Sequence, residues 1–402
     1  MVAARDSVAR PALLELHCSD EHEVVPQRQI SLEFAPSTLP DKKKPRKFRD
    51  SLSAVELADD GRTLFLGCDE TVDRAPTIER LSWTGDGYAA HQPLHVEEFL
   101  TLAEPTPKKG RVPEIDIEGL AVCASFLWVV GSHSASRKKP KHHSAEEDIE
   151  RLASVKLGPN RVLLGRIPLV STAEGSTLTK RDGARRSAQL AGDLREMLCD
   201  DPLLGPFVRA YENAEGERFT IPGKDNGFDI EDIVVTPGSA AASRVLLGLR
   251  GPVLRGWATI LEIAPIEGDA PDQLVLGPVG PSGKSRYRKH LLHLEGLGIR
   301  DLRADGDDVL ILAGPTMTLD GQVAIYRWVG GLSTSSGDTL TDLAAGRLEH
   351  VLDVPSGHGE DRPEGFVRLP SGELLVVYDG PAQARLAGEH GVRADVFAFP
   401  LA

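Results

Sequence analysis

The sequence has few aromatic residues and no long apolar run. Only 5% of its 402 residues are aromatic, which is too few for a base-stacking surface and argues against single-strand nucleic-acid recognition. No segment approaches the roughly 18 consecutive apolar residues that span a bilayer, so we expect no membrane insertion. Residues 1–6 lack the basic start and apolar stretch of a signal peptide. We therefore expect a cytoplasmic protein.

Cysteine pairs and familiar catalytic motifs are also missing. The four cysteines show no CxxC spacing, which favours reduced thiols over a disulfide scaffold or a zinc site. The glycine-rich segment 277–285 resembles a P-loop, but Pro278 stands where the first glycine belongs and no apolar helix follows. Since GxGxxG after a strand, HExxH and GxSxG are absent as well, we expect no nucleotide cofactor.

The residues that are abundant indicate a folded chain of many short elements. Hydrophobic residues make up 41% and charged residues 26%, with 40 glycines and 28 prolines. Such a composition excludes disorder of the whole chain and predicts many turns. The formal net charge of −14 argues against a nucleic-acid or anionic-membrane partner.

One short pattern, centred on a glutamate, returns five times. The five glutamates are Glu56, Glu118, Glu231, Glu295 and Glu364. About ten to fifteen residues after each, an apolar run rich in Val, Ile, Leu and aromatic residues ends in small or polar residues, as strands do. A third strand is expected in each repeat, at 77–83, 161–170, 257–263, 322–328 and 393–399.

The repeats predict the architecture. Successive glutamates lie 62, 113, 64 and 69 residues apart, and a strand near residues 29–34 would complete the last repeat. Radial repeats of small antiparallel sheets that close by joining both termini make a β-propeller. We predict an all-β, single-domain propeller over residues 1–402, with five blades and with six as the alternative. A helical insertion is expected around 172–224, and a poorly structured tail over 1–26.

Basic residues cluster despite the acidic total. Residues 42–49, 108–111, 137–141 and 284–289 hold seventeen of the 46 lysines and arginines. The loop order of a propeller would place all four runs on one rim, around the face where the glutamate pattern opens each first strand. Two sets of residues define the expected ligand site. The strand-end residues are Asp69, His133, Arg250 and Asp379, and the basic rim includes Arg46, Lys47, Lys108, Arg137, Lys138, Arg286 and Arg288.

Four segments carry a family resemblance. They read DIEGLA from Asp116, LWVVGSHS from Leu127, DNGFDIE from Asp225 and VLLGLRGP from Val245. With these segments the chain resembles, over nearly its whole length, a bacterial family of unknown function. The repeated Glu-Gly is also loosely similar to the esterase-like phytase and SdiA-regulated propellers, which implies a propeller with a calcium-binding channel.

The repeated glutamates predict a carboxylate ring at the channel mouth. Its members would be Glu56, Glu118, Glu231, Glu295, Glu364, Asp116 and Asp229. Clustered carboxylates need protons, donors or a cation, and a hard cation such as calcium or magnesium prefers oxygen ligands. The alternative is structural, with each glutamate accepting backbone N–H groups from the next blade.

A carboxylate centre inside a basic rim suits a phosphorylated or other anionic ligand. The enzymatic version is metal-assisted phosphoester hydrolysis, with Glu118, Glu231 and His133 as weak catalytic candidates and Arg250, Arg286 and Arg288 as phosphate clamps. Ser132 and Ser134 flank His133, but neighbours on a strand point to opposite faces, which argues against a nucleophile–base pair. The competing hypothesis is a non-enzymatic scaffold for an acidic protein partner. A deep channel mouth would favour the small anionic ligand, and a flat ring of basic residues would favour the acidic protein partner.

Overall fold

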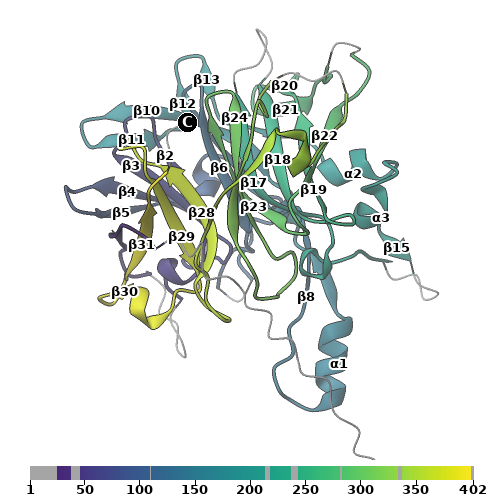
Figure 1. The fold of residues 1–402 in the computed structure, drawn as a ribbon, viewed down its shortest axis with the longest axis horizontal. Helices are drawn as coiled ribbons and strands as arrows, with labels where there is room; N and C mark the ends of the chain where they lie inside the picture. Colours follow the sequence, from purple (N-terminus) through teal and green to yellow (C-terminus); the bar gives the residue numbers. More distant parts are fainter. Residues whose placement is uncertain are drawn as a thin grey trace, which may run out of the picture.

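The computed structural model describes residues 25–37, 46–108, 110–212, 218–236, 243–280, 283–333 and 337–399, and strands dominate this part of the chain (Figure 1). The tail predicted over residues 1–26 lies outside the described residues except for Val25 and Pro26. Among the helices of the described ranges, none is long and apolar enough to cross a membrane.

The antiparallel pairings group the main strands into five four-stranded units. Unit 1 contains β2 (Leu52–Leu57), β3 (Thr63–Cys68), β4 (Thr77–Trp83) and β5 (Tyr88–His95). Unit 2 contains β6 (Ile117–Cys123), β7 (Phe126–Gly131), β10 (Leu164–Thr172) and β14 (Ala188–Leu190). Unit 3 contains β17 (Asp229–Thr236), β18 (Arg244–Gly251), β19 (Trp257–Ile263) and β22 (Tyr287–His293). Unit 4 contains β23 (Gly298–Asp305), β24 (Asp308–Gly314), β25 (Ala324–Trp328) and β27 (Leu348–Asp353). Unit 5 contains β28 (Arg362–Arg368), β29 (Leu374–Asp379), β31 (Gly391–Phe397) and β1 (Arg28–Glu33).

The first strands of the units form a closed ring. They contact one another in the order β2, β6, β17, β23, β28 and back to β2. Strand β1, the first described strand, pairs antiparallel with β31, the last one, along its whole length, so both belong to unit 5, as predicted. Such a ring of small antiparallel sheets is a β-propeller. The described strands form these five units, and the count of five blades, with six as the alternative, stays a prediction for the whole chain.

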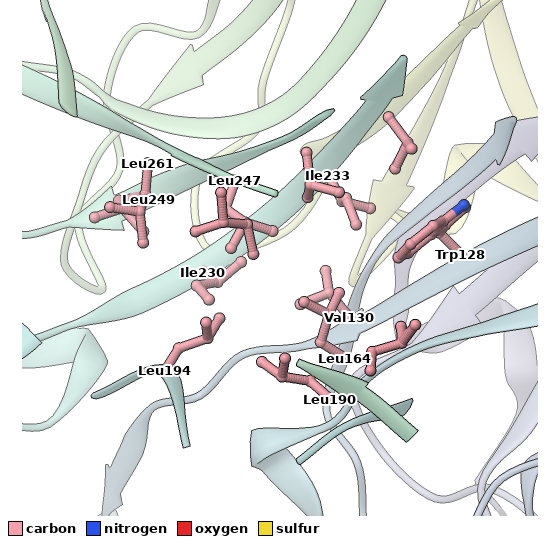
Figure 2. Close-up of a cluster of buried hydrophobic side chains, with 14 of the residues drawn as sticks. Trp128, Val130, Leu164, Leu190, Leu194, Ile230, Ile233, Leu247, Leu249 and Leu261 are labelled. Atoms are coloured by element: carbon pink, nitrogen blue, oxygen red, sulfur yellow. The ribbon is translucent and has the colours of Figure 1, made fainter. Parts of the chain in front are cut away.

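Apolar side chains on both faces of the strands hold neighbouring units together. Figure 2 shows one such cluster, in which Trp128 and Leu164 of unit 2 lie opposite Ile233 and Leu247 of unit 3. Burial of each such large side chain contributes about 1.5–3 kcal/mol.

Two glycines on second strands let neighbouring units approach closely. A Cβ on Gly67 would lie 2.6 Å from Ile117, and one on Gly248 would lie 2.5 Å from Ile299. Because Ile117 and Ile299 belong to the first strand of the following unit, any larger residue would push the ring apart.

The segment 172–224 is only partly helical. It contains two short helices, α2 (Leu194–Leu198) and α3 (Gly205–Val208), together with β14, the outer strand of unit 2. Leu190, which lies inside the predicted helical insertion, is therefore a strand residue. Gly192 and Pro202 separate these short elements because neither residue favours a helix interior.

The longest helix in the described ranges, α1 (Ala145–Ala153), was not predicted. It lies between two short strands, β8 (Ala135–Arg137) and β9 (Val155–Leu157), which pair with each other. Figure 1 shows it projecting from the sheets at the bottom of the view. Helix α1 buries none of its residues, and Ser144 caps its first turn. Its large apolar residues are Ile149 and Leu152, both exposed, and nine residues are too short a stretch to identify a helix by its periodicity.

Candidate functional site

Every first strand carries a β-bulge at the same position. The register of each first strand with the second skips one residue just after the strand begins. A bulge turns the extra side chain out of the regular alternation. The five skipped residues are Ser53, Glu118, Glu231, Arg300 and Glu364. The bulge explains why the glutamate pattern recurs. At each bulge, a first strand presents a polar side chain next to the neighbouring first strands.

The bulged side chains differ in their partners. Arg250 donates to the Glu231 carboxylate at 3.0 Å, and Arg300 donates to both carboxylate oxygens of Glu364. Ser53 donates to the Ile117 carbonyl at 2.5 Å. Glu118 has no hydrogen bond or ion pair with any residue that the structure describes. The ring thus contains two neutralised carboxylates and one carboxyl group without a described partner.

Glu56 and Glu295 do not belong to this ring, which corrects the predicted set of seven carboxylates. Glu56 lies three residues beyond the bulge and accepts from the Val122 N–H at 2.8 Å, so it locks unit 1 to unit 2. Glu295 precedes its strand and accepts from the Tyr326 hydroxyl at 2.9 Å. The bulge residues of units 1 and 4 are instead Ser53 and Arg300. In these two units the glutamate of the repeated pattern does not fall at the bulge, whereas in units 2, 3 and 5 it does.

Further carboxylates lock the ring below the bulges, around Arg303. Asp232 accepts from the Leu302 N–H at 2.7 Å, and Asp301 accepts from the Phe366 N–H at 2.5 Å. The Arg303 guanidinium lies 2.9 Å from each of these two carboxylates. It also donates to the carbonyls of Val55 and Phe366. Arg303 therefore connects units 1, 3, 4 and 5, and the structural interpretation holds for this layer.

A cavity of about 360 Å³ opens at the mouth of the ring. We call it the acidic cavity. Its carboxylate lining residues are Asp69, Glu70, Glu114, Asp116, Glu118, Asp225, Asp229 and Glu231, and its basic lining residues are Arg137, Lys138, Lys139, Arg161 and Lys224. Carboxyl groups outnumber cations, so the cavity carries a negative excess.

Several of these charges neutralise one another. Arg161 lies 2.6 Å from carboxylate oxygens of both Glu114 and Asp116. Arg137 pairs with Asp225 at 2.6 Å. These pairs remove much of the cavity's wall charge before any ligand enters.

Three carboxyl groups remain without a direct partner in the described part of the chain: Asp69, Glu118 and Asp229. They come from units 1, 2 and 3 and line the same cavity. The Oδ1 atom of Asp69 is buried and accepts no hydrogen bond. The Lys224 ammonium lines the cavity too and forms no hydrogen bond or ion pair with a described residue. Buried polar groups are normally hydrogen-bonded, so the buried Asp229 carboxyl, with the half-buried Asp69 and Glu118 beside it, marks a candidate site.

The electrostatics of the cavity follow from this lack of partners. Burial, followed by repulsion from Glu231, raises the pKa of Asp229 to about 8 and that of Glu118 well above its ordinary value. Burial and the nearby Asp379 raise the pKa of Asp69 as well. Burial and Arg250 act to lower the pKa of Lys224, but attraction to the three carboxylates of Asp69, Glu118 and Glu231 outweighs them and raises it. The cavity favours protons or another cation.

A second cavity, of about 350 Å³, adjoins the first and is mainly basic. We call it the basic cavity. Arg161, Glu114 and Ser136 line both cavities. The cations of the basic cavity are Arg46, Lys108, Arg111, Lys156 and Arg161, and its carboxylate is Glu114. Two of the predicted basic runs, 42–49 and 108–111, contribute to it, together with Lys156, which the sequence did not single out.

The rim predicted from four basic runs is wrong. In unit 3 successive strands are antiparallel, so β17 and β19 begin at the mouth and β22 begins at the opposite end. Arg286 and Arg288 stand at the start of β22 and therefore lie far from the mouth. Arg288 pairs there with Glu262 at 3.0 Å, and Arg286 donates to the Leu276 carbonyl. The error arose because segment 284–289 opens the outer strand of its unit rather than the inner one.

Other predicted ligand residues are occupied or hidden. Arg250 is buried against Glu231 and the Thr316 carbonyl, so the three predicted phosphate clamps do not converge. Asp379 pairs with Arg362 at 3.1 Å. His133 is fully buried and lines neither cavity, with its Nδ1 3.8 Å from Asp193. His133 therefore contributes to neither cavity, and its ligand-binding role stays a prediction.

The predicted metal ligands do not form a common site as they stand. Among the described residues no group of three or more His, Cys, Asp or Glu side chains is placed to hold a metal ion. Of the seven predicted ligands, Glu118 and Asp229 have no direct partner within the described ranges, and Lys224 lies beside them. Calcium or magnesium at the mouth thus stays a prediction, and we derive no step through it.

Lys224 and Arg161 are central to the site but were missed. Lys224 belongs to the short helix η4 (Gly223–Asp225), directly before β17. Its sequence neighbours Asp225 and Asn226 were noted only for a family resemblance, and a lone lysine in a loop gives no signal of its own. Arg161 lies in η3 (Pro159–Val162), and only the fold brings it to the two carboxylates that it binds.

The fold and the paired cavities define an all-β propeller with a charged channel mouth. Residues 51–395 match the family described as "Protein of unknown function (DUF3616)". Because this match covers most of the chain, the protein belongs to that family. A search of curated proteins found no match.

Similar solved structures are only distantly related. Hydrazine synthase from Kuenenia stuttgartiensis is 11% identical with a TM-score of 0.29, over 87% of this chain and 62% of that chain. A putative oxidoreductase (glucose dehydrogenase) from Thermus thermophilus is 12% identical with a TM-score of 0.35, over 92% of this chain and 100% of that chain. These low scores carry no functional argument.

Proposed function

We propose that the protein binds a small phosphorylated ligand at the channel mouth, with the phosphoryl group in the basic cavity. The observation that supports this proposal is the adjacency of the two cavities, which share Arg161, Glu114 and Ser136. The remainder of the ligand would enter the acidic cavity.

The charge of the basic cavity supports an anionic group there. Five cations and one carboxylate line it, in a protein whose total charge is −14. Some of these cations have partners at the rim: Arg46 lies 3.2 Å from Glu70, and Lys108 lies 2.6 Å from Glu104. Lys156 is exposed and forms no side-chain hydrogen bond or ion pair within the described ranges. Guanidinium and ammonium groups that converge on a concavity are the usual means of binding phosphate.

The shape of the mouth favours a small ligand over an acidic protein. With Arg286 and Arg288 at the opposite end, the basic residues do not form a flat annulus. Two concave sites of about 350 and 360 Å³ fall in the size range of small-molecule sites. An acidic protein partner stays the alternative, and metal-assisted hydrolysis of the bound ester stays a prediction.

Titration calorimetry with inorganic phosphate and pyrophosphate tests the proposal. We expect weak binding that Lys156→Glu weakens at least tenfold and that falls as salt rises, because the contacts are partly exposed. Arg286→Glu is the matched control, since it makes the same charge change far from the mouth. Equal losses in both variants would show a general charge effect, and unchanged binding in Lys156→Glu would contradict the site.

A further inference from the structure

The carboxyl group of Asp229 is buried, faces the acidic cavity and has no partner in the described part of the chain. The residue is 3% exposed and lines the cavity. No described residue gives its carboxyl a hydrogen bond or an ion pair. By contrast Asp232, three residues further along β17, is equally buried and is held by an N–H group and a guanidinium.

The position of the Asp229 carboxyl is fixed by the loop that precedes its strand. A Cβ on Gly223 would lie 2.3 Å from Asp229 Oδ2, so the carboxyl packs directly against the glycine backbone. Gly223 begins η4, whose Lys224 lines the same cavity. A larger residue at position 223 would therefore displace the carboxyl from this position.

Asp229 shares its surroundings with two more carboxyl groups that lack partners among the described residues. Glu118 projects from the bulge of β6, and Asp69 follows β3 with its Oδ1 atom buried and unbonded. Three acceptors therefore face one unattached ammonium, that of Lys224. The Asp229 carboxyl, which is buried, requires a further donor to be satisfied.

We propose that these carboxyl groups, which we call the floor of the acidic cavity, bind a primary ammonium group. The ligand is then a free phosphorylated amine. This inference rests on the proposed function, because it places the amine in the acidic cavity while the phosphoryl group occupies the basic one. An ammonium group has three N–H donors, so it can donate to Asp229 and to a neighbouring carboxyl without the closed set of ligands that a metal ion requires. A metal ion suits the floor less well, since no metal-binding group exists among the described residues and Lys224 lies beside the carboxyls.

Aminoalkyl phosphates of two to six carbons test the inference against hydroxyalkyl phosphates of the same lengths. The series covers the distance between the cavities without assuming it. For at least one length we expect the amine to bind at least tenfold tighter than the alcohol. Asp229→Asn should abolish this preference, measured as the ratio of the two Kd values. Glu118→Gln should reduce the preference, and Asp307→Asn, at an exposed turn of unit 4, is the matched control.

The outcomes separate the two proposals. If inorganic phosphate binds but amines and alcohols bind alike, the ammonium site is wrong and the phosphate site stands. A preference that survives in both Asp229→Asn and Glu118→Gln would also overturn the ammonium site. If phosphate, amines and alcohols all fail to bind to the full chain, the proposed function itself is wrong.

Discussion

Replacing Asp229 with asparagine should stabilise the protein, although the residue is buried in the ring. Its carboxyl has no direct partner in the described structure, and its pKa is raised from 3.8 to about 8 by burial and then by Glu231. Since the folded state holds this proton more tightly than the unfolded chain, wild-type stability falls as pH rises from about 4 to about 8. Asparagine lacks this dependence.

The magnitude follows from the shift. At pH 7, about three pH units above the ordinary pKa, the upper bound of the gain is about 4 kcal/mol at ~1.4 kcal/mol per unit. Because the amide must also be desolvated, we expect a net gain of about 1–3 kcal/mol. With about 2.1 cal/mol/K of unfolding entropy per residue, this raises Tm by roughly 1–4 °C. The gain should shrink to nearly zero at about pH 4.

Asp232→Asn provides the comparison on the same strand. Asp232 accepts from the Leu302 N–H at 2.7 Å and lies 2.9 Å from Arg303. Burial raises the pKa of Asp232 as well, but loss of its charge weakens a buried, hydrogen-bonded pair and leaves Arg303 short of a partner, which should cost about 2–4 kcal/mol. Differential scanning calorimetry of both variants from pH 4 to 8 measures the contrast. A Tm drop in Asp229→Asn as large as that in Asp232→Asn would refute the account of an unpartnered carboxyl.

Three further predictions concern the ring, the predicted cation and the insertion. Arg303→Met should destabilise the protein by about 3–5 kcal/mol, because it leaves Asp232 and Asp301 buried without their cation; a denaturant titration with an unchanged midpoint would contradict this. If a divalent cation binds at the mouth, a chelator should lower Tm and added calcium should restore it. At a hundredfold excess of cation over Kd, binding adds about 2.7 kcal/mol to the free energy of unfolding. A melting curve that neither chelator nor calcium changes would contradict the cation site. Within the segment 172–224, amide exchange should be slow in β14, which is paired on both sides, and fast at Tyr211 and Glu212, which are exposed; uniform protection across the segment would make it an integral part of the sheets.

The sequence predicted the propeller because its signals are local and repeated. Four of the five expected third strands match: 77–83 and 257–263 match β4 and β19 in full, and 322–328 and 393–399 match β25 and β31 to within two residues. The joining of β1 to the last unit followed from repeat length alone. Apolar strands bounded by turn residues can be recognised from their own sequence, because the pattern does not depend on which strands they pair with.

The site was only partly predictable, because it depends on register and on partners. The repeated glutamate pattern identified the bulge residues Glu118, Glu231 and Glu364. In the other two units the bulge residues are Ser53 and Arg300, which are not glutamates, so the pattern did not identify them. Whether a carboxyl is free or neutralised depends on distant arginines such as Arg250. The misplacement of Arg286 has the same origin, since a run of charges does not reveal which strand of a unit it opens.

The most direct test of the central claim is the location of a bound anion. Crystals of the full chain soaked in tungstate, a heavy analogue of phosphate, would show the anion by anomalous scattering. The account predicts a peak in the basic cavity, among Lys108, Arg111 and Lys156, and its loss in Lys156→Glu. A map with no peak in that cavity, or with a peak only beside Arg286 at the opposite end, would contradict it.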